Sequence, residues 1–205
     1  MPELPEVEIT RRGIAGPLTG CRVNDVIVRN ASLRWPVPAE LRDILTGQTL
    51  QDIDRRAKYL LLRFDSGMLI IHLGMSGSLR VLASGLPPEK HDHVDIAFGD
   101  LTLRLRDPRR FGAVLWHQGA DIEHVLLAGL GPEPLGSDFG AAALHGALAR
   151  RQCAIKLAIM DSSVVVGVGN IYASESLFRA RIRPGTAARR LTLPQAGRLA
   201  DEIRR

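Results

Sequence analysis

The 205-residue sequence contains only two cysteines, Cys21 and Cys153, which lie far apart and outside any CxxC or Cys/His cluster. This scarcity disfavours a disulfide scaffold and a cysteine-based zinc site within these residues, and it is typical of a reduced, cytosolic protein. No apolar run approaches the roughly 20 residues that a membrane-spanning helix needs. The acidic start, MPELPEVE, lacks the basic and apolar regions of a signal peptide, so neither secretion nor membrane insertion is expected.

Lysine is also scarce, because Lys58, Lys90 and Lys156 are the only lysines among 27 basic residues. Arginine clusters instead in RLRDPRR and again between residues 179 and 205, and the formal net charge is +5. Guanidinium groups suit phosphate oxygens, so the arginines favour a polyanionic partner such as nucleic acid. A GC-rich genome would enrich arginine as well, and composition alone leaves both explanations open.

The start of the chain predicts a short helix. Pro5 suits a first helical turn, Glu6 and Glu8 would complement the positive end of the helix dipole, and Gly13 would weaken the helix end. Short segments rich in branched residues follow, separated by turn formers, and Gly99-Asp100 is the two-residue link expected of a hairpin. They are VNDVIVRN, KYLLLRF, MLIIHL, SLRVL, HVDIAF, LTLRLR and AVLWH. Residues 1–120 therefore predict a β-sandwich or barrel domain.

The character of the sequence changes after about residue 120. Residues 121–135 predict a linker within a Gly/Pro-rich stretch, and residues 136–205 predict a helical domain. Helical spacing occurs in AAALHGALARRQ, AIKLAIMD, NIYASESLFRARI and LPQAGRLADEIRR, the last with Thr192 as its N-cap. The expected fold class is α+β, with an N-terminal β-sandwich and leading helix followed by helices. The last amphipathic helix has no capping glycine, which suggests a C-terminally truncated product.

Pro2 is a candidate nucleophile. If Met1 is removed, the Pro2 nitrogen becomes a secondary amine that can attack an electrophilic carbon and form an iminium. A terminal amine has a reference pKa of about 8 against about 10.4 for lysine, so far more of it is unprotonated at neutral pH. Glu3 could exchange a proton beside it. These residues could instead serve only to start a helix. A tautomerase would also use a terminal proline, although in a shorter chain that begins with a strand.

Seven stretches in order, across residues 1 to about 180, resemble bacterial formamidopyrimidine-DNA glycosylase. They are MPELPEVE, RRAKYLLL, IIHLGMSGSLR, PPEKHDHVD, DPRRFGA, LGPEPL and VVVGVGNIYASESLF. The resemblance implies a base-excision repair enzyme that excises oxidised purines, such as 8-oxoguanine and formamidopyrimidines, and then cleaves the strand as an AP lyase by β- and δ-elimination through a Schiff base. The ELPEVE start and the DPRRFG loop favour this purine branch over the endonuclease VIII relatives.

The resemblance also implies residue roles. Pro2 matches the nucleophile, Glu3 the acid/base carboxylate and Lys58 a second proton-transfer residue. A guanidinium holds its proton too tightly to replace the ammonium of Lys58 in that role. Met75, Arg109 and Phe111 match the residues that fill the void left by the extruded nucleotide, with Arg109 facing the orphaned cytosine. The poor core settings of Met75 and Phe111, among glycines and arginines, agree with exposed positions.

The remaining matches concern DNA. Gly167 and Gly169 precede a helix start at Asn170, where exposed amides and the helix dipole could hold a phosphate. In the family this stretch belongs to the helix-two-turn-helix element, and Asn170 grips the DNA backbone. The other matched positions are His91, Arg151 and Lys156 as DNA contacts, and Glu6 and Glu175 near the damaged base.

The partner implied by the resemblance is double-stranded DNA with oxidised purines or abasic sites, bound by a monomer in the bacterial cytoplasm and nucleoid. No cofactor or metal is expected in this chain. Family members carry one zinc ion in a C-terminal four-cysteine finger, for which this chain has neither the cysteines nor the length. A truncated, catalytically impaired lesion or abasic-site binding module is therefore the alternative. A retained Met1 would place the Pro2 nitrogen in an amide and remove the nucleophile.

Overall fold

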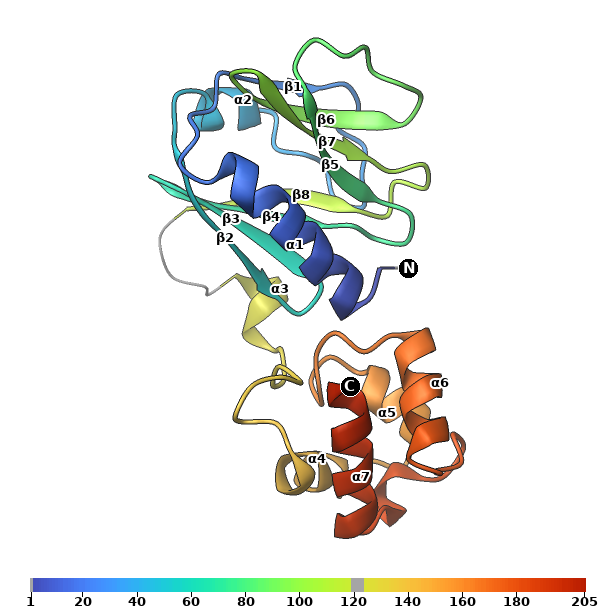
Figure 1. The fold of residues 1–205 in the computed structure, drawn as a ribbon. Coiled ribbons are helices and arrows are strands. Elements are labelled where there is room, and N and C mark those ends of the chain that lie inside the picture. The colour runs from blue at the N-terminus through green and yellow to red at the C-terminus, as the bar shows by residue number, and fades with distance from the viewer. Residues whose placement is uncertain (1, 119–123) are drawn as a thin grey trace. The chain divides into compact units, whose positions relative to one another are not determined.

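The computed structural model describes residues 2–118 and 124–205. The chain divides into two compact units, residues 1–122 and 123–205 (Figure 1). The expected linker, residues 121–135, falls partly outside the described residues, and its remaining part carries the short helix α3 (Val125–Ala128). No helix within the described ranges is long and apolar enough to cross a membrane.

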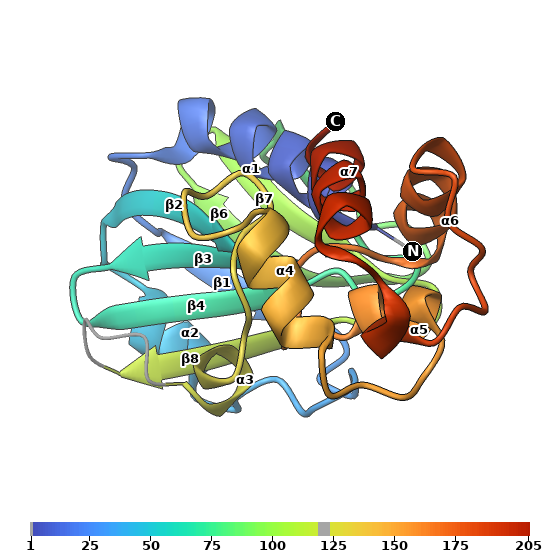
Figure 2. The same ribbon diagram turned by 90° about the horizontal axis from the view of Figure 1, so that it is seen from below.

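The first unit is built from two four-stranded antiparallel sheets, with strand orders β1-β6-β7-β5 and β2-β3-β4-β8. Figure 2 shows the strands of the second sheet side by side in that order. The bounds are β1 Asp25–Val28, β2 Leu50–Arg56, β3 Tyr59–Phe64, β4 Gly67–His72, β5 Ser78–Ala83, β6 Asp92–Phe98, β7 Leu101–Arg106 and β8 Ala113–Gln118. The predicted sandwich is confirmed, and Gly99-Asp100 forms the expected tight link, because Phe98 pairs with Leu101.

Apolar side chains from both sheets form one core. Leu60 and Leu62 of β3 are fully buried in the same cluster as Ile96 of β6 and Leu103 of β7. The first helix, α1 (Leu4–Leu18), contacts β2 and β5, which are edge strands of the two different sheets. Helix α1 therefore closes one open side of the sandwich, and it presents its own amino-terminal end at the margin of the sheets.

The structure corrects one expectation and adds two elements that the sequence did not predict. Helix α1 does not end near Gly13 but continues through it to Leu18, because burial of Ile14 and Leu18 contributes about 1.5–3 kcal/mol each, more than the ~1 kcal/mol cost of a helical glycine. Strand β2 escaped prediction because charged residues occupy most of LQDIDRR, although Leu50 and Ile53 are buried. The short helix α2 (Leu41–Leu45), which packs on β1, was also not predicted.

The second unit is helical. After α3 come α4 (Ala141–Leu148), α5 (Ile155–Met160), α6 (Asn170–Arg179), a 3-10 turn η1 (Ala188–Arg190) and α7 (Leu193–Arg204). Helix α7 packs on both α4 and α6, and α5 packs on α6. The four predicted helices are confirmed, as is the N-cap: Thr192 and Gln195 form a capping box at the start of α7.

Turns over residues 161–169 join α5 to α6. The Gly131 N–H donates to the Ser162 carbonyl at 2.8 Å, and the Val166 N–H donates to the Pro132 carbonyl at 3.1 Å. A Cβ on Gly131 would lie 2.6 Å from the carbonyl oxygen of Ser163, so only glycine permits this approach. The LGPEPL stretch therefore fixes the path of the turns between the two helices.

Candidate active site and nucleic-acid interface

The amino-terminal end of α1 holds Glu3 in a defined position. Glu3 is the N-cap of the helix and is only 2% exposed. It forms a capping box with Glu6, in which the Glu3 N–H donates to Glu6 Oε2 at 2.9 Å. Because each residue satisfies an otherwise unpaired amide of the first turn, the box fixes the chain directly behind Pro2. The structure gives Glu6 this capping contact and leaves it exposed.

Lys58 lies in the tight turn between β2 and β3. Arg56 pairs with Tyr59, so Ala57 and Lys58 form a two-residue loop, and Ala57 has a left-handed φ of 54°. Such a φ is uncommon for a residue with a Cβ, and two-residue hairpins require it. The Arg55 guanidinium supports the turn by donating to the Ala57 carbonyl at 2.8 Å. The hairpin thereby fixes where the Lys58 side chain starts.

Burial lowers the pKa of the Lys58 ammonium from its ordinary value, while the carboxylates of Glu3 and Glu6 act in the opposite direction. These carboxylates therefore lie near enough to Lys58 to act on its charge, although Lys58 is about 55 positions away in the sequence. A half-buried ammonium with a lowered pKa releases its proton more readily than an exposed lysine. The structure thus brings Glu3 and Lys58, two of the three predicted catalytic residues, near each other, and Glu3 directly follows Pro2 in the chain.

Glu8 connects these two elements. Its carboxylate accepts from Arg11 at 2.8 Å, from Arg12 at 2.8 Å and from Arg55 of β2 at 3.2 Å. Hydrogen bonds from Arg11 lead the causes that lower the pKa of Glu8 to about 2, with Arg12 and Arg55 adding to them against the opposing effect of burial. Glu8 was expected to complement the helix dipole, and its actual contacts are with these guanidinium groups.

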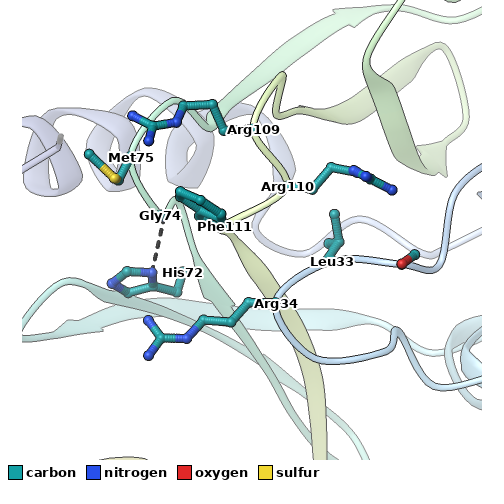
Figure 3. Close-up of a pocket in the computed structure, with 9 residues that line it drawn as sticks. Leu33, Arg34, His72, Gly74, Met75, Arg109, Arg110 and Phe111 are labelled. Carbon is teal, nitrogen blue, oxygen red and sulfur yellow. Dashed lines mark hydrogen bonds between the residues drawn. The ribbon is translucent and has the colours of Figure 1, made fainter.

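The predicted void-filling residues lie on two adjacent loops, which we call the Met75 loop (residues 73–77) and the Arg109 loop (residues 107–112). Met75 is 41% exposed and Phe111 45% exposed, as expected for residues outside the core. The Arg109 guanidinium lies 4.9 Å from the centre of the Phe111 ring. The three side chains therefore gather on one side of the sandwich (Figure 3).

The two loops contact each other closely. Gly74 has a left-handed φ of 62°, and a Cβ there would lie 2.4 Å from the backbone carbon of Phe111. Beside the loops is a cavity of about 690 Å³, which the figure shows with its lining side chains (Figure 3). Its lining comprises Ser32, Leu33, Arg34, His72, Gly74, Met75, Arg109, Arg110 and Phe111. Arginines and apolar side chains together suit a nucleic acid, which presents phosphates and flat bases.

His72, in this cavity, was not singled out from the sequence. Burial lowers the pKa of its imidazole to about 4, and the positive charges of Arg34 and Lys58 add to this effect. The Gly74 N–H donates to His72 Nδ1 at 3.0 Å, so the neutral ring carries its proton on Nε2. The apolar run MLIIHL predicts a strand, and a histidine within it gives no sign of a functional role. The proximity of His72 to Lys58 becomes evident only in the fold.

His91 lies between β5 and β6 with a left-handed φ of 77°. Its ring is 6.4 Å from that of His93, and its carbonyl accepts from the Asp107 N–H at 3.0 Å. The segment that carries it is therefore attached to the Arg109 loop.

In the second unit, Asn170 is exposed and is the first residue of α6, after Gly169 as N-cap. Lys156 lies on α5 and is half-buried. Arg151 is engaged within the unit, because it donates to Asp161 Oδ2 at 2.5 Å and to Ser163 at 2.8 Å. Glu175 is exposed and lies 3.6 Å from the Arg179 guanidinium.

The residues present do not fit a zinc site. Cys21 belongs to the first unit and Cys153 to the second, and neither is bonded to another cysteine. Within residues 2–118 and 124–205, no group of three or more His, Cys, Asp or Glu side chains could hold a metal ion. A tetrahedral cysteine site needs four such ligands.

The two units correspond to two domains of one class of DNA glycosylase. The model of the formamidopyrimidine-DNA glycosylase N-terminal domain matches residues 1–114, and that of the formamidopyrimidine-DNA glycosylase H2TH domain matches residues 130–205. The chain therefore belongs to the formamidopyrimidine-DNA glycosylase family, whose members are DNA-binding repair enzymes.

Individual relatives support this family assignment. The formamidopyrimidine-DNA glycosylase of Thioalkalivibrio sulfidiphilus is 60% identical over 205 residues, which are 100% of this chain and 76% of the relative. That of Methylococcus capsulatus is 58% identical over 99% of this chain and 75% of the relative. The chain thus spans about three quarters of these proteins.

A solved structure has the same fold. Lactococcus lactis formamidopyrimidine-DNA glycosylase, non-covalently bound to DNA with an AP site, has a TM-score of 0.91 and 32% identity, covering 98% of this chain and 78% of that one. A mutant of the L. lactis protein in complex with Fapy-dG-containing DNA also has a TM-score of 0.91, with 33% identity over 99% of this chain and 76% of that one.

Proposed function

We propose that this glycosylase excises oxidised purines from duplex DNA and cleaves the resulting abasic site through a Schiff base to Pro2. The observation that supports the proposal is that Glu3, next to Pro2 in the chain, is the buried N-cap of α1 and that its charge acts on Lys58. A buried carboxylate and a half-buried ammonium near it can supply acid/base chemistry to the Pro2 amine once Met1 is removed.

Formation of the Schiff base makes two bonds and breaks two. The Pro2 nitrogen attacks the deoxyribose C1′ and loses its proton, while the glycosidic bond breaks with its electron pair leaving on the base, which takes up a proton. The nitrogen lone pair then forms the C1′=N bond of the iminium as the C1′–O4′ bond opens, and Glu3 supplies the proton for the sugar oxygen. Lys58 supplies or accepts the second proton. Removal of acidic protons from the sugar then permits β- and δ-elimination, which cleaves the strand.

Extrusion of the damaged nucleotide leaves a gap in the duplex, and we assign Met75, Arg109 and Phe111 to fill it. Their exposure on adjacent loops and the stacking of Arg109 on Phe111 support this role. For the second unit we assign Asn170 to a backbone phosphate, since it opens α6 at the positive end of the helix dipole. We propose His91, Lys156 and Arg151 as further DNA contacts, and Glu6 and Glu175 as residues near the lesion.

Borohydride trapping tests the mechanism. Protein from which Met1 has been removed is incubated with duplex containing 8-oxoguanine opposite cytosine, borohydride is added, and the crosslinked species is mapped by mass spectrometry. We expect an adduct on Pro2, and we expect Pro2→Gly to weaken the crosslink while leaving duplex binding unchanged. An adduct on a different residue contradicts the role of Pro2. Binding without any crosslink supports instead a lesion- or abasic-site binding module without catalysis.

A further inference from the structure

Asp107 lies at the start of the Arg109 loop, and its side chain is completely buried. Three donors from two loops converge on its carboxylate. Ser76 Oγ of the Met75 loop donates to Oδ1 at 2.7 Å, the Gly112 N–H donates to Oδ2 at 2.7 Å, and the Arg109 N–H approaches Oδ1 at 3.3 Å. A single buried carboxylate therefore joins the loop that carries Met75 to both ends of the loop that carries Arg109 and Phe111.

The main chain of Asp107 extends this connection to a third segment. Its N–H donates to the His91 carbonyl at 3.0 Å, and its carbonyl lies 2.8 Å from His93 Nε2. Both the backbone and the side chain of Asp107 are thus used in contacts between segments far apart in the sequence. The Arg109 N–H also approaches Ser76 Oγ at 3.2 Å, so the serine hydroxyl contacts both loops.

Close backbone packing restricts the conformations that these two loops can adopt. A Cβ on Gly112 would lie 3.0 Å from Asp107 Oδ2 and 2.8 Å from the His72 carbonyl oxygen. A Cβ on Gly77 would lie 2.2 Å from the Leu73 carbonyl oxygen. Glycine at these two positions lets the donors reach the carboxylate, and the carboxylate then compensates the desolvation of the buried amides.

We propose that Asp107 is a positioning residue: through Ser76 and Gly112 its carboxylate fixes Met75, Arg109 and Phe111 in one arrangement before DNA binds. Wedge residues that are already ordered lose less conformational entropy on insertion into the duplex, and Arg109 then meets the opposite base in one geometry. Asp107 thereby determines selectivity for the base opposite the lesion. The role in DNA rests on the proposed function, whereas the ordering of the loops does not.

Asp107→Asn isolates the contribution of the carboxylate, because Ser76 and Gly112 donate to different oxygens and the amide replaces one of these oxygens with an NH2 group, which cannot accept. Ser76→Ala is the second and milder variant, since it removes a single hydroxyl from a half-exposed side chain. Ser76→Thr restores a hydroxyl and serves as rescue. Asp100→Asn, in the exposed turn between β6 and β7, is the matched control with the same change of charge.

The first measurement is independent of DNA chemistry. Arg109 and Arg110 are trypsin sites within the loop, and slow nicking there reports how often the loop opens. Well below the midpoint of thermal unfolding, we expect nicking at these sites to rise about tenfold in Asp107→Asn, which loses a buried hydrogen bond, and about threefold in Ser76→Ala, which loses a partly buried one. Ser76→Thr and Asp100→Asn should nick like the wild type. Equal nicking in wild type, Asp107→Asn and Ser76→Ala overturns the proposal.

The second measurement compares substrates. For Asp107→Asn and Ser76→Ala, we expect excision of 8-oxoguanine opposite cytosine to fall. The preference of the enzyme for 8-oxoguanine opposite cytosine over 8-oxoguanine opposite adenine should also shrink. Cleavage of an abasic site in single-stranded DNA should change less than about threefold. A uniform loss on all three substrates overturns the proposal, because it indicates a purely structural role. A wild type that neither excises nor traps refutes the proposed function instead, and the nicking experiment then still decides whether Asp107 orders the loops.

Discussion

Arg55 Nε lies 3.2 Å from Glu8 Oε2, and this contact joins the β2–β3 hairpin, with Lys58 in its turn, to the helix that begins behind Glu3. Arg11 adds a second connection, because its Nη1 donates to the Ile53 carbonyl of β2 at 3.2 Å. The relative position of the two predicted proton-transfer residues therefore depends on an ion-pair cluster that contains neither of them.

Glu8→Gln tests this dependence. The glutamine amide lacks the negative charge of the Glu8 carboxylate, to which three guanidinium groups donate hydrogen bonds. We therefore expect the free energy of unfolding to fall by about 1–3 kcal/mol. We also expect trapping on abasic-site DNA to slow by about tenfold, because a small displacement of Lys58 relative to Glu3 is costly for proton transfer. The measurements are urea unfolding and borohydride trapping. Glu40→Gln, an exposed glutamate before α2, is the control, and equal trapping by both variants contradicts the positioning role of Glu8.

Acid should weaken the same cluster. The pKa of Glu8 is lowered to about 2 from an ordinary 4.5, so its pairing stabilises the folded state fully above pH 4.5 and is lost as the pH falls toward 2. We expect the difference in unfolding free energy between wild type and Glu8→Gln to shrink across this window. Urea unfolding at pH 5, 4 and 3 measures it, and a difference that stays constant with pH would be incompatible with the lowered pKa.

Local sequence patterns predicted most of the fold. Runs such as KYLLLRF and LTLRLR carry enough branched residues to identify β3 and β7, and the capping box at Thr192 is a local signal. Strand β2 lacked such a signal because its charged residues face partners that only the fold supplies: Arg55 contacts Glu8, and Arg63 contacts Asp54 at 2.7 Å. The composition of a strand with so many charged residues does not distinguish it from a loop.

Local sequence patterns predicted less of the candidate site than of the fold. Nothing in the residues around Lys58 indicates that it lies near Glu3, and only the family resemblance suggested a shared role. Asp107 and Ser76 are 31 positions apart, and an aspartate beside a proline is an ordinary turn former. Their hydrogen bond is a property of the packed loops, so no spacing rule along the chain could have predicted it.

Lys58→Arg tests proton transfer by Lys58. Arginine keeps the positive charge but holds its proton far more tightly, so we expect excision of 8-oxoguanine to fall about 100-fold, in the range typical of a lost general acid. Duplex binding should change little, since the charge is retained. Lys90→Arg, in an exposed loop, is the control. Single-turnover excision with a separate binding titration separates the two effects, and full activity of Lys58→Arg would rule out a proton-transfer role.

His72 should titrate far below an ordinary histidine. Burial lowers its pKa to about 4 from 6.5, so between these values the unfolded state binds a proton that the folded state does not, and His72 lowers stability as the pH falls through this window. We expect the imidazole resonances of His72 to have a midpoint near pH 4 in an NMR titration, with His72→Asn used for assignment. Protonation of Nδ1 would remove the acceptor of the Gly74 N–H, so the Gly74 amide resonance should shift with the same midpoint. A midpoint near 6.5 would mean that the ring is solvated, and a Gly74 amide that does not respond would contradict its hydrogen bond to Nδ1.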